Sequence, residues 1–222
     1  NNFGFGETCD FIDELMVINV TPNPSKDDFK RYFYDVKNLR EKIFVPITLG
    51  GGIRNLDIAK ECFENGADKI LINFLAHKNK KICEKISNIF GEQSISIMVD
   101  YKKDYKDYDF TFIESGKLKS KLLNKFLSSI KTLKFGELIL NSISNDGTGS
   151  GLDLDCIKNI PSNFNKSILL MGGAGKPEHL YQVLTEGGAD AALVASMVHY
   201  GDYTVGQLKD YLHKRGLKIR LC

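Results

Sequence analysis

The sequence predicts an α/β fold, namely a (β/α)8 TIM barrel built from two half-barrel repeats. Three observations point to this fold. Apolar runs of strand length alternate with segments of helical periodicity along the 222 residues, a pattern typical of parallel strands joined by helices. A glycine-rich turn follows one apolar run at residues 49–53, and a second follows another run at residues 170–175. Longer stretches around both turns also match each other, which indicates a duplicated half-domain.

The two halves resemble each other at nearly constant spacing. Residues 65–73 (NGADKILIN) follow the first turn, and residues 187–195 (GGADAALVA) follow the second, 122 residues later. Glu14 and Glu137, 123 residues apart, each begin a further matched pair, ELMV and ELIL. Such an offset is far too long for a solenoid repeat. We therefore expect a single domain over residues 1–222, with halves at roughly 1–92 and 93–222.

The periodicity places the elements in chain order. Strands are expected at residues 14–20, 45–49, 69–72, 94–100, 137–141, 167–171 and 191–195. Helices are expected at residues 26–39, 56–64, 78–90, 122–133, 154–160, 178–185 and 204–215. Ser25 and Asn55 are candidate N-caps of the first two helices, and a helix after Ala195 could be capped by Ser196. The alternating residues 109–113 predict a β-hairpin inserted after the fourth strand.

Seven alternating strands leave the barrel one β/α unit short. By the repeat offset, the counterpart of the strand ending at Asp100 would lie about 22 residues before Asn1. An unclosed barrel would expose two sheet edges. We therefore expect the first unit to be missing from the sequence in hand, or incomplete in it, rather than absent from the protein.

Composition excludes several classes of function. The net charge is +2 and the basic residues are dispersed, so the sequence lacks the basic patch that is typical of nucleic-acid-binding proteins. No apolar run is long enough to cross a membrane and no signal peptide is evident, so we expect a cytoplasmic protein. The five cysteines lack metal-ligand spacing, so no metal and no cofactor is predicted. Cys62, Cys83 and Cys156 fall in helical patterns and are expected to be reduced core thiols.

The carboxyl ends of the strands are where a parallel barrel carries its active site. Glycine turns at these ends offer backbone N–H groups that can cradle a phosphate. The first expected phosphate site comprises Gly50, Gly51, Gly52 and Asn73. The second comprises Gly147, Gly173, Ala195 and Ser196, and Asp146 and Gly172, also at strand ends, are further expected substrate-binding residues. Two such sites predict a ligand with a phosphate at each end.

One carboxylate, Asp100, ends an apolar strand, and its predicted role is that of general acid or base. The alternative is a helix cap, or an ion pair with Lys102 or Lys103. Asp146 is a second candidate acid, although Asp-Gly is also a common turn pair. His77 and His199 follow strand ends without metal-ligand company and are expected to serve packing or surface roles.

These motifs, taken in order, resemble the cyclase subunits of imidazole glycerol phosphate synthases. The motifs are IDEL at 12–15, LGGGI at 49–53, GADK at 66–69, VD at 99–100, NDGT at 145–148, GGAGK at 172–176 and GADAA at 188–192. The related isomerase of the same pathway is a barrel of the same kind, and it is the main alternative family for these motifs. The resemblance implies that ammonia from a glutaminase partner reacts with a bis-phosphorylated ribulosyl substrate, closing an imidazole ring and releasing a carboxamide ribotide.

The resemblance also implies roles for individual residues. Asp100 corresponds to one of two catalytic aspartates, and the other lies on the first strand that this sequence lacks. Glu14, Lys69 and Glu137 match a charged gate through which ammonia enters, and Asp68 would face the glutaminase. The alternative for the three gate residues is a buried salt-bridge layer at the bottom of the barrel.

Four positions depart from the family pattern. Asn19 and Ser144 stand where acids are common, Phe74 stands where a threonine is usual, and Met171 replaces a small polar residue. These departures leave two alternatives open. One is an ammonia-channelling paralogue that serves a sugar amidotransferase in surface-glycan biosynthesis. The other is a non-catalytic scaffold that only binds and activates the glutaminase.

Overall fold

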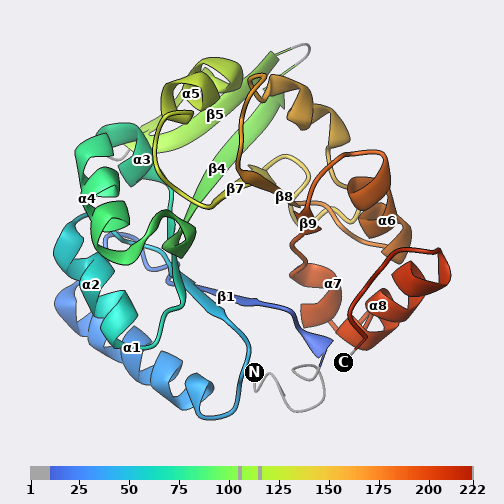
Figure 1. Ribbon diagram of the computed structural model, residues 1–222, viewed down its shortest axis with the longest axis horizontal. Helices are drawn as coiled ribbons and strands as arrows, with labels where there is room; N and C mark the ends of the chain where they lie inside the picture. The colour runs from blue at the N-terminus through green and yellow to red at the C-terminus, as the bar shows by residue number, and fades with distance from the viewer. Residues whose placement is uncertain (1–10, 105–106, 115–116, 222) are drawn as a thin grey trace. The chain divides into compact units, whose positions relative to one another are not determined.

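The computed structural model describes residues 11–104, 107–114 and 117–221 (Figure 1). They form two compact units. The N-terminal unit comprises Asp13–Met98 and Thr132–Glu137, and the C-terminal unit comprises the remaining described residues. The chain passes from the first unit to the second within strand β4.

The N-terminal unit alternates parallel strands with helices. Its elements are β1 (Leu15–Ile18), α1 (Lys26–Arg40), β2 (Ile47–Gly50), α2 (Leu56–Glu64), β3 (Lys69–Ile72), α3 (Phe74–Lys78), α4 (Lys80–Phe90), the short 3-10 helix η2 (Glu92–Ser94) and the start of β4 (Ile95–Asp104). Strands β1 to β4 are neighbours in chain order, and each adjacent pair of them is parallel. The expected βαβ rhythm is confirmed in this unit.

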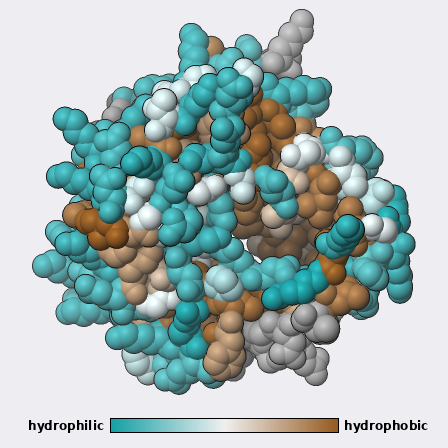
Figure 2. Space-filling model, in the orientation of Figure 1, coloured by the Kyte–Doolittle hydropathy of each residue, from teal (hydrophilic) through white to brown (hydrophobic). Residues whose placement is uncertain are grey.

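Helix α1 shows how local sequence sets these elements. Ser25 accepts a hydrogen bond from the backbone N–H of Asp28, whose side chain bonds back to the N-cap residue, so the predicted cap is a full capping box. Phe29, Phe33 and Val36 are buried at helical spacing. The outer side of α1 is mostly hydrophilic in the space-filling view (Figure 2). Asn55 caps α2 in the same way as predicted, through the N–H of Ile58.

The C-terminal unit continues the pattern with an antiparallel insertion. Its elements are the end of β4, β5 (Asp107–Glu114), β6 (Lys117–Leu122), α5 (Leu123–Ile130), β7 (Glu137–Ser142), the 3-10 helix η3 (Leu154–Asn159), β8 (Ser167–Met171), α6 (Pro177–Thr185), β9 (Ala191–Ala192), α7 (Ser196–His199) and α8 (Val205–Lys214). The strand order is β4-β7-β8-β9, with β5 antiparallel to both β4 and β6. Glu137, the first residue of β7, belongs to the N-terminal unit.

Strand β4 is longer than the sequence predicted. The predicted strand ended at Asp100, but β4 continues to Asp104 because Tyr101 and the three residues after it pair with β5. The buried Phe110 of β5 stacks on Phe126 of α5 with ring centroids 3.9 Å apart, which anchors the ribbon to the helix. Asp100 therefore lies within a strand, and the predicted hairpin is part of a three-stranded antiparallel ribbon.

Two further predictions need correction. The last predicted strand, 191–195, shortens to Ala191–Ala192, because the chain turns into α7 soon afterwards. Helix α7 begins at Ser196 itself, with Ala195 in the N-cap position and no side-chain cap, so Ser196 is not the cap. The short helix α3, which begins at Phe74, was not predicted; the side chain of Phe74 lies outside the described part.

The described residues thus form a parallel sheet with covering helices, an α/β fold consistent with a TIM-type barrel. Cys62, Cys83 and Cys156 are buried free thiols, as predicted, and burial raises the pKa of each to about 12. Within the described ranges, no helix has the length and apolar character needed to span a membrane.

Candidate functional site

The two glycine turns share one local structure. Gly51 has a φ of +89° and Gly172 a φ of +91°, values that side chains rarely adopt. A Cβ on Gly51 would overlap the backbone carbonyl of Asn19, and one on Gly172 would lie 2.5 Å from the carbonyl oxygen of Ser142. Each turn therefore packs directly on the end of a neighbouring strand. By conformation Gly172 corresponds to Gly51, and not to Gly50, which the predicted offset had paired with it.

The first predicted phosphate group lies in the N-terminal unit. Strand register pairs Gly50 with Leu71, so Gly52 and Asn73 leave the sheet at the same edge from adjacent strands. Gly52 also has a positive φ, +72°, and a Cβ there would lie 2.5 Å from Pro24. The structure thus brings the predicted residues of this group to one edge of the sheet.

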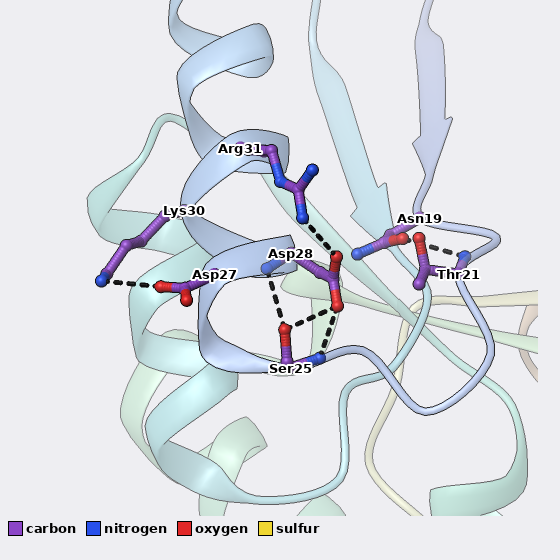
Figure 3. A network of polar contacts seen from close by, with 7 residues as sticks. All are labelled: Asn19, Thr21, Ser25, Asp27, Asp28, Lys30 and Arg31. Atoms are coloured by element: carbon purple, nitrogen blue, oxygen red, sulfur yellow. Dashed lines mark hydrogen bonds and ion pairs between the residues drawn. The ribbon is translucent and has the colours of Figure 1, made fainter.

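A cavity of about 310 Å³ opens beside the end of β1 in the same unit. It is lined by Ile18, Asn19, Val20, Thr21, Asp28, Arg31, Tyr32 and Asp35. Figure 3 shows the polar contacts of residues along this cavity. The side chain of Asn19 accepts a hydrogen bond from the N–H of Thr21. The carboxylate of Asp28 accepts hydrogen bonds from Ser25 and forms an ion pair with Arg31. Hydrogen bonds from Ser25 lower the pKa of Asp28. The sequence offered no signal for this cavity beyond the unusual asparagine at Asn19.

The second predicted phosphate group lies in the C-terminal unit, where two glycine-rich loops interlock. The N–H of Gly151 donates to the carbonyl of Gly173 at 2.8 Å, and the side chain of Asn145 donates to the carbonyl of Gly151 at 3.1 Å. A Cβ on Gly175 would lie 2.5 Å from the carbonyl oxygen of Gly149. The loop carrying Asp146 and Gly147 is therefore fixed to the turn that carries Gly172 and Gly173.

His179 on α6 supports this turn and was not predicted. Its Nδ1 accepts a hydrogen bond from the N–H of Gly175 at 3.2 Å, which requires a ring with Nδ1 unprotonated. Burial and the charge of Lys176 lower the pKa of His179, against the opposing charge of Glu178. In the adjacent strands, register pairs Leu170 with Ala192. Ala195 and Ser196 therefore follow β9 at the edge where Gly172 and Gly173 follow β8.

Asp100, the candidate acid or base, is half-buried on β4. Its Oδ1 accepts a hydrogen bond of 2.7 Å from the side-chain amide of Asn141 on β7. Asn141 is itself only 8% exposed. Lys103, one of the alternative partners considered for Asp100, lies 3.7 Å from Asp155. The structure thus places Asp100 beside a buried amide that the sequence analysis had not singled out.

A second cavity, of about 480 Å³, lies beside the antiparallel ribbon and is lined by Lys103, Asn145, Ser150, Gly151, Leu152, Asp153, Leu154 and Asp155. The hydroxyls of Tyr101 and Tyr108 both donate to Asp153, at 3.3 and 3.2 Å. These contacts hold the end of the polar loop against the ribbon. Within the part of the chain that the structure describes, no group of three or more potential side-chain ligands could hold a metal ion.

The three predicted gate residues meet in the N-terminal unit. The ammonium of Lys69 bonds Glu14 at 2.8 Å and also bonds Glu137. Two buried hydroxyls complete the group, since Thr48 donates to Glu14 and Ser96 to Glu137, each at 2.6 Å. We name Glu14, Thr48, Lys69, Ser96 and Glu137 the Lys69 cluster. Sequence reasoning missed the two hydroxyl residues, although each is a polar residue near the start of an apolar strand.

Asp68 has a local structural role that is repeated in the other unit. Its carboxylate accepts from the N–H of Ile47 at 2.8 Å, while its own N–H donates to the carbonyl of Ile47. Asp190 exchanges the same two hydrogen bonds with Ile168. Asp68 differs in also pairing with Arg40 at 3.1 Å. The duplication seen in the sequence therefore extends to individual hydrogen bonds.

Comparison with known proteins supports a common origin for this arrangement. A family model described as histidine biosynthesis protein matches residues 10–204. The chain is 36% identical over 210 residues to the imidazole glycerol phosphate synthase subunit HisF of Prosthecochloris aestuarii, covering 94% of this chain and 82% of that protein. It is 33% identical over 229 residues to the HisF subunit of Methanocaldococcus jannaschii (94% and 84% covered). The corresponding values for Pyrococcus furiosus HisF are 36% over 211 residues (95% and 82%).

Proposed function

Because this chain belongs to the histidine biosynthesis protein family, we propose that it is the cyclase subunit of an imidazole glycerol phosphate synthase. The observation that carries the proposal is its identity of 33–36% to subunits of that name over more than nine-tenths of its length. The reaction joins ammonia to a bis-phosphorylated ribulosyl aminoimidazole carboxamide ribotide. The products are imidazole glycerol phosphate and aminoimidazole carboxamide ribotide.

Asp100 is the acid or base of this reaction. Adding ammonia to a carbonyl carbon and closing an imidazole ring both require proton transfers, and a positioned carboxyl group can carry them. The half-buried setting of Asp100 on β4 and its hydrogen bond from Asn141 support this role. The hydrogen bond fixes the orientation of the carboxylate, so that Asp100 can accept or donate a proton at a defined position.

The glycine turns bind the two phosphates of the substrate. Gly50, Gly51, Gly52 and Asn73 bind one, and Gly147, Gly173, Ala195 and Ser196 bind the other. Asp146 and Gly172 are further substrate-binding residues. Glycines with positive φ bring backbone N–H groups close to an anion without an intervening side chain. The interlocked loops around Gly151 and Gly173 support the second site, because they hold its backbone in one conformation before the substrate arrives.

Ammonia comes from a glutaminase partner and enters past the Lys69 cluster. Lys69 bridges two carboxylates there, so a small polar molecule passing the cluster meets groups that can exchange hydrogen bonds with it. Asp68 lies next to Lys69 in the sequence, and its side chain is 41% exposed. This exposure supports a contact between Asp68 and the partner.

The test is ammonium-dependent cyclisation of the ribulosyl substrate by the purified full-length protein. We expect turnover, with Asp100→Asn lowering kcat by about 10²–10⁴-fold, the usual contribution of general acid–base catalysis. Asp104→Asn is the matched control, since it makes the same change at the exposed end of the same strand. Glutamine hydrolysis with the partner but no cyclisation would instead favour the ammonia-channelling paralogue.

A further inference from the structure

Asn141 is an amide that directly follows an apolar stretch of β7. The three residues before it, Leu138 to Leu140, are fully buried, and Asn141 is 8% exposed. Packing would favour another aliphatic side chain at this position, because a buried amide must find partners for both its N–H₂ group and its oxygen. The position therefore calls for a reason other than packing.

The hydrogen bonds of Asn141 show what the amide does. Its Nδ2 donates to Oδ1 of Asp100 at 2.7 Å. The orientation follows from chemistry, since the flipped amide would set its oxygen against a carboxylate oxygen. The amide oxygen that results is buried and has no hydrogen-bond partner among the described residues. Burying an unpaired acceptor destabilises a fold. The side chain of Asn141 therefore bonds Asp100 through its nitrogen, although this leaves its oxygen without a hydrogen bond.

Gly172 leaves the room for this arrangement. A Cβ on Gly172 would lie 3.1 Å from the amide oxygen of Asn141, tighter than most such contacts. The glycine that opens the second turn thus also allows the amide to sit where it reaches Asp100. All three residues lie within the C-terminal unit.

We propose that Asn141 is a positioning residue for Asp100 in the cyclisation reaction. It fixes the rotation of the carboxylate with a neutral donor, which holds the group without placing a positive charge beside it as a lysine would. Because it acts through Asp100, its effect falls on the chemical step rather than on substrate binding. The inference rests on the proposed function and adds a residue to its machinery.

The test compares Asn141→Leu with wild type in two measurements on the full protein. In the cyclisation assay, kcat should fall by about tenfold to a hundredfold, the range expected on losing a hydrogen bond to a charged group, while KM changes little. In urea unfolding, the midpoint should stay the same or rise, because leucine removes the unpaired buried oxygen. Asn159→Leu is the matched control. Its amide donates to the carbonyl of Cys156, so it should lower the midpoint and leave kcat unchanged.

Asn141→Asp provides a second variant of the same shape, in which the donor becomes a carboxylate facing Asp100. It should lose kcat at least as strongly as the leucine variant. Wild-type kcat in either variant, or a loss of activity explained by unfolding alone, would overturn the inference while leaving the proposed function intact. If the wild-type protein itself neither binds nor turns over the substrate, both fail together.

Discussion

Lys69→Met should destabilise the protein, because Lys69 is the cation between Glu14 and Glu137. Neither carboxylate can turn away freely, since Thr48 and Ser96 donate to their other oxygens. Ion pairs at the surface contribute about 0–1 kcal/mol, whereas removing one partner of a buried pair costs about 3–5 kcal/mol. The side chains here are 20%, 34% and 18% exposed for Lys69, Glu14 and Glu137, between those limits. We therefore expect a loss of about 2–3 kcal/mol.

Urea unfolding followed by circular dichroism measures this loss, and thermal unfolding should show a Tm lower by about 4–12 °C. The control is the triple variant Glu14→Gln, Lys69→Met, Glu137→Gln. It keeps the shapes but leaves no unpaired charge, so it should recover part of the lost stability. A single variant as stable as wild type, or a triple variant no better than the single, would refute the reasoning.

The pH dependence of the same difference gives an independent check. Burial alone would lower the pKa of Lys69, but hydrogen bonds and charge from Glu137 and Glu14 outweigh it and raise that pKa above its ordinary 10.5. A raised pKa in the folded state means that the charged lysine stabilises the fold fully below pH 10.5 and loses this effect as pH rises further. The gap in unfolding free energy between wild type and Lys69→Met should therefore be constant near neutral pH and shrink above about 10.5.

Two further predictions address the partner and the second glycine turn. Asp68→Asn should weaken binding of the glutaminase measured by calorimetry. Asp190→Asn alters the same type of backbone bond and should lower stability only; equal binding losses for both variants would exclude a contact at Asp68. His179 has a lowered pKa, so the stability that it provides should be present above its ordinary pKa of 6.5 and decline as pH falls below it. His179→Asn, whose amide oxygen can still accept from Gly175, should flatten this decline in pH-dependent urea unfolding, and an unchanged decline would show that other groups cause it.

The sequence was most informative where a single physical signal decided the structure. Ser25 and Asn55 cap their helices as predicted, because an N-cap depends on residues a few positions apart. Strand β4 was predicted too short because its last four residues, 101–104, have the sequence YKKD, which is typical of a polar turn. What extends them is pairing with β5, a tertiary contact that local periodicity does not contain.

The site likewise contains residues that the sequence predicted and one whose role it did not. Glu14, Lys69 and Glu137 were predicted from the resemblance to the cyclase subunits, and the structure brings their side chains together. Asn141 was given no role of its own, because an asparagine near a strand end is also typical of the beginning of a loop. Its importance depends on the distance to Asp100, 41 residues earlier.

The comparison of the two units separates residues that build the fold from residues suited to chemistry. Asp68 and Asp190 bond the backbone of the preceding strand alike, and Gly51 and Gly172 share one backbone conformation. These features are repeated because in both units a strand N–H needs a hydrogen-bond acceptor and a glycine turn lies against a backbone carbonyl. The next residue after each aspartate is not repeated, since Lys69 in one unit becomes Ala191 in the other. A residue that the backbone does not require is free to differ, and at Lys69 it carries the charge that joins two carboxylates.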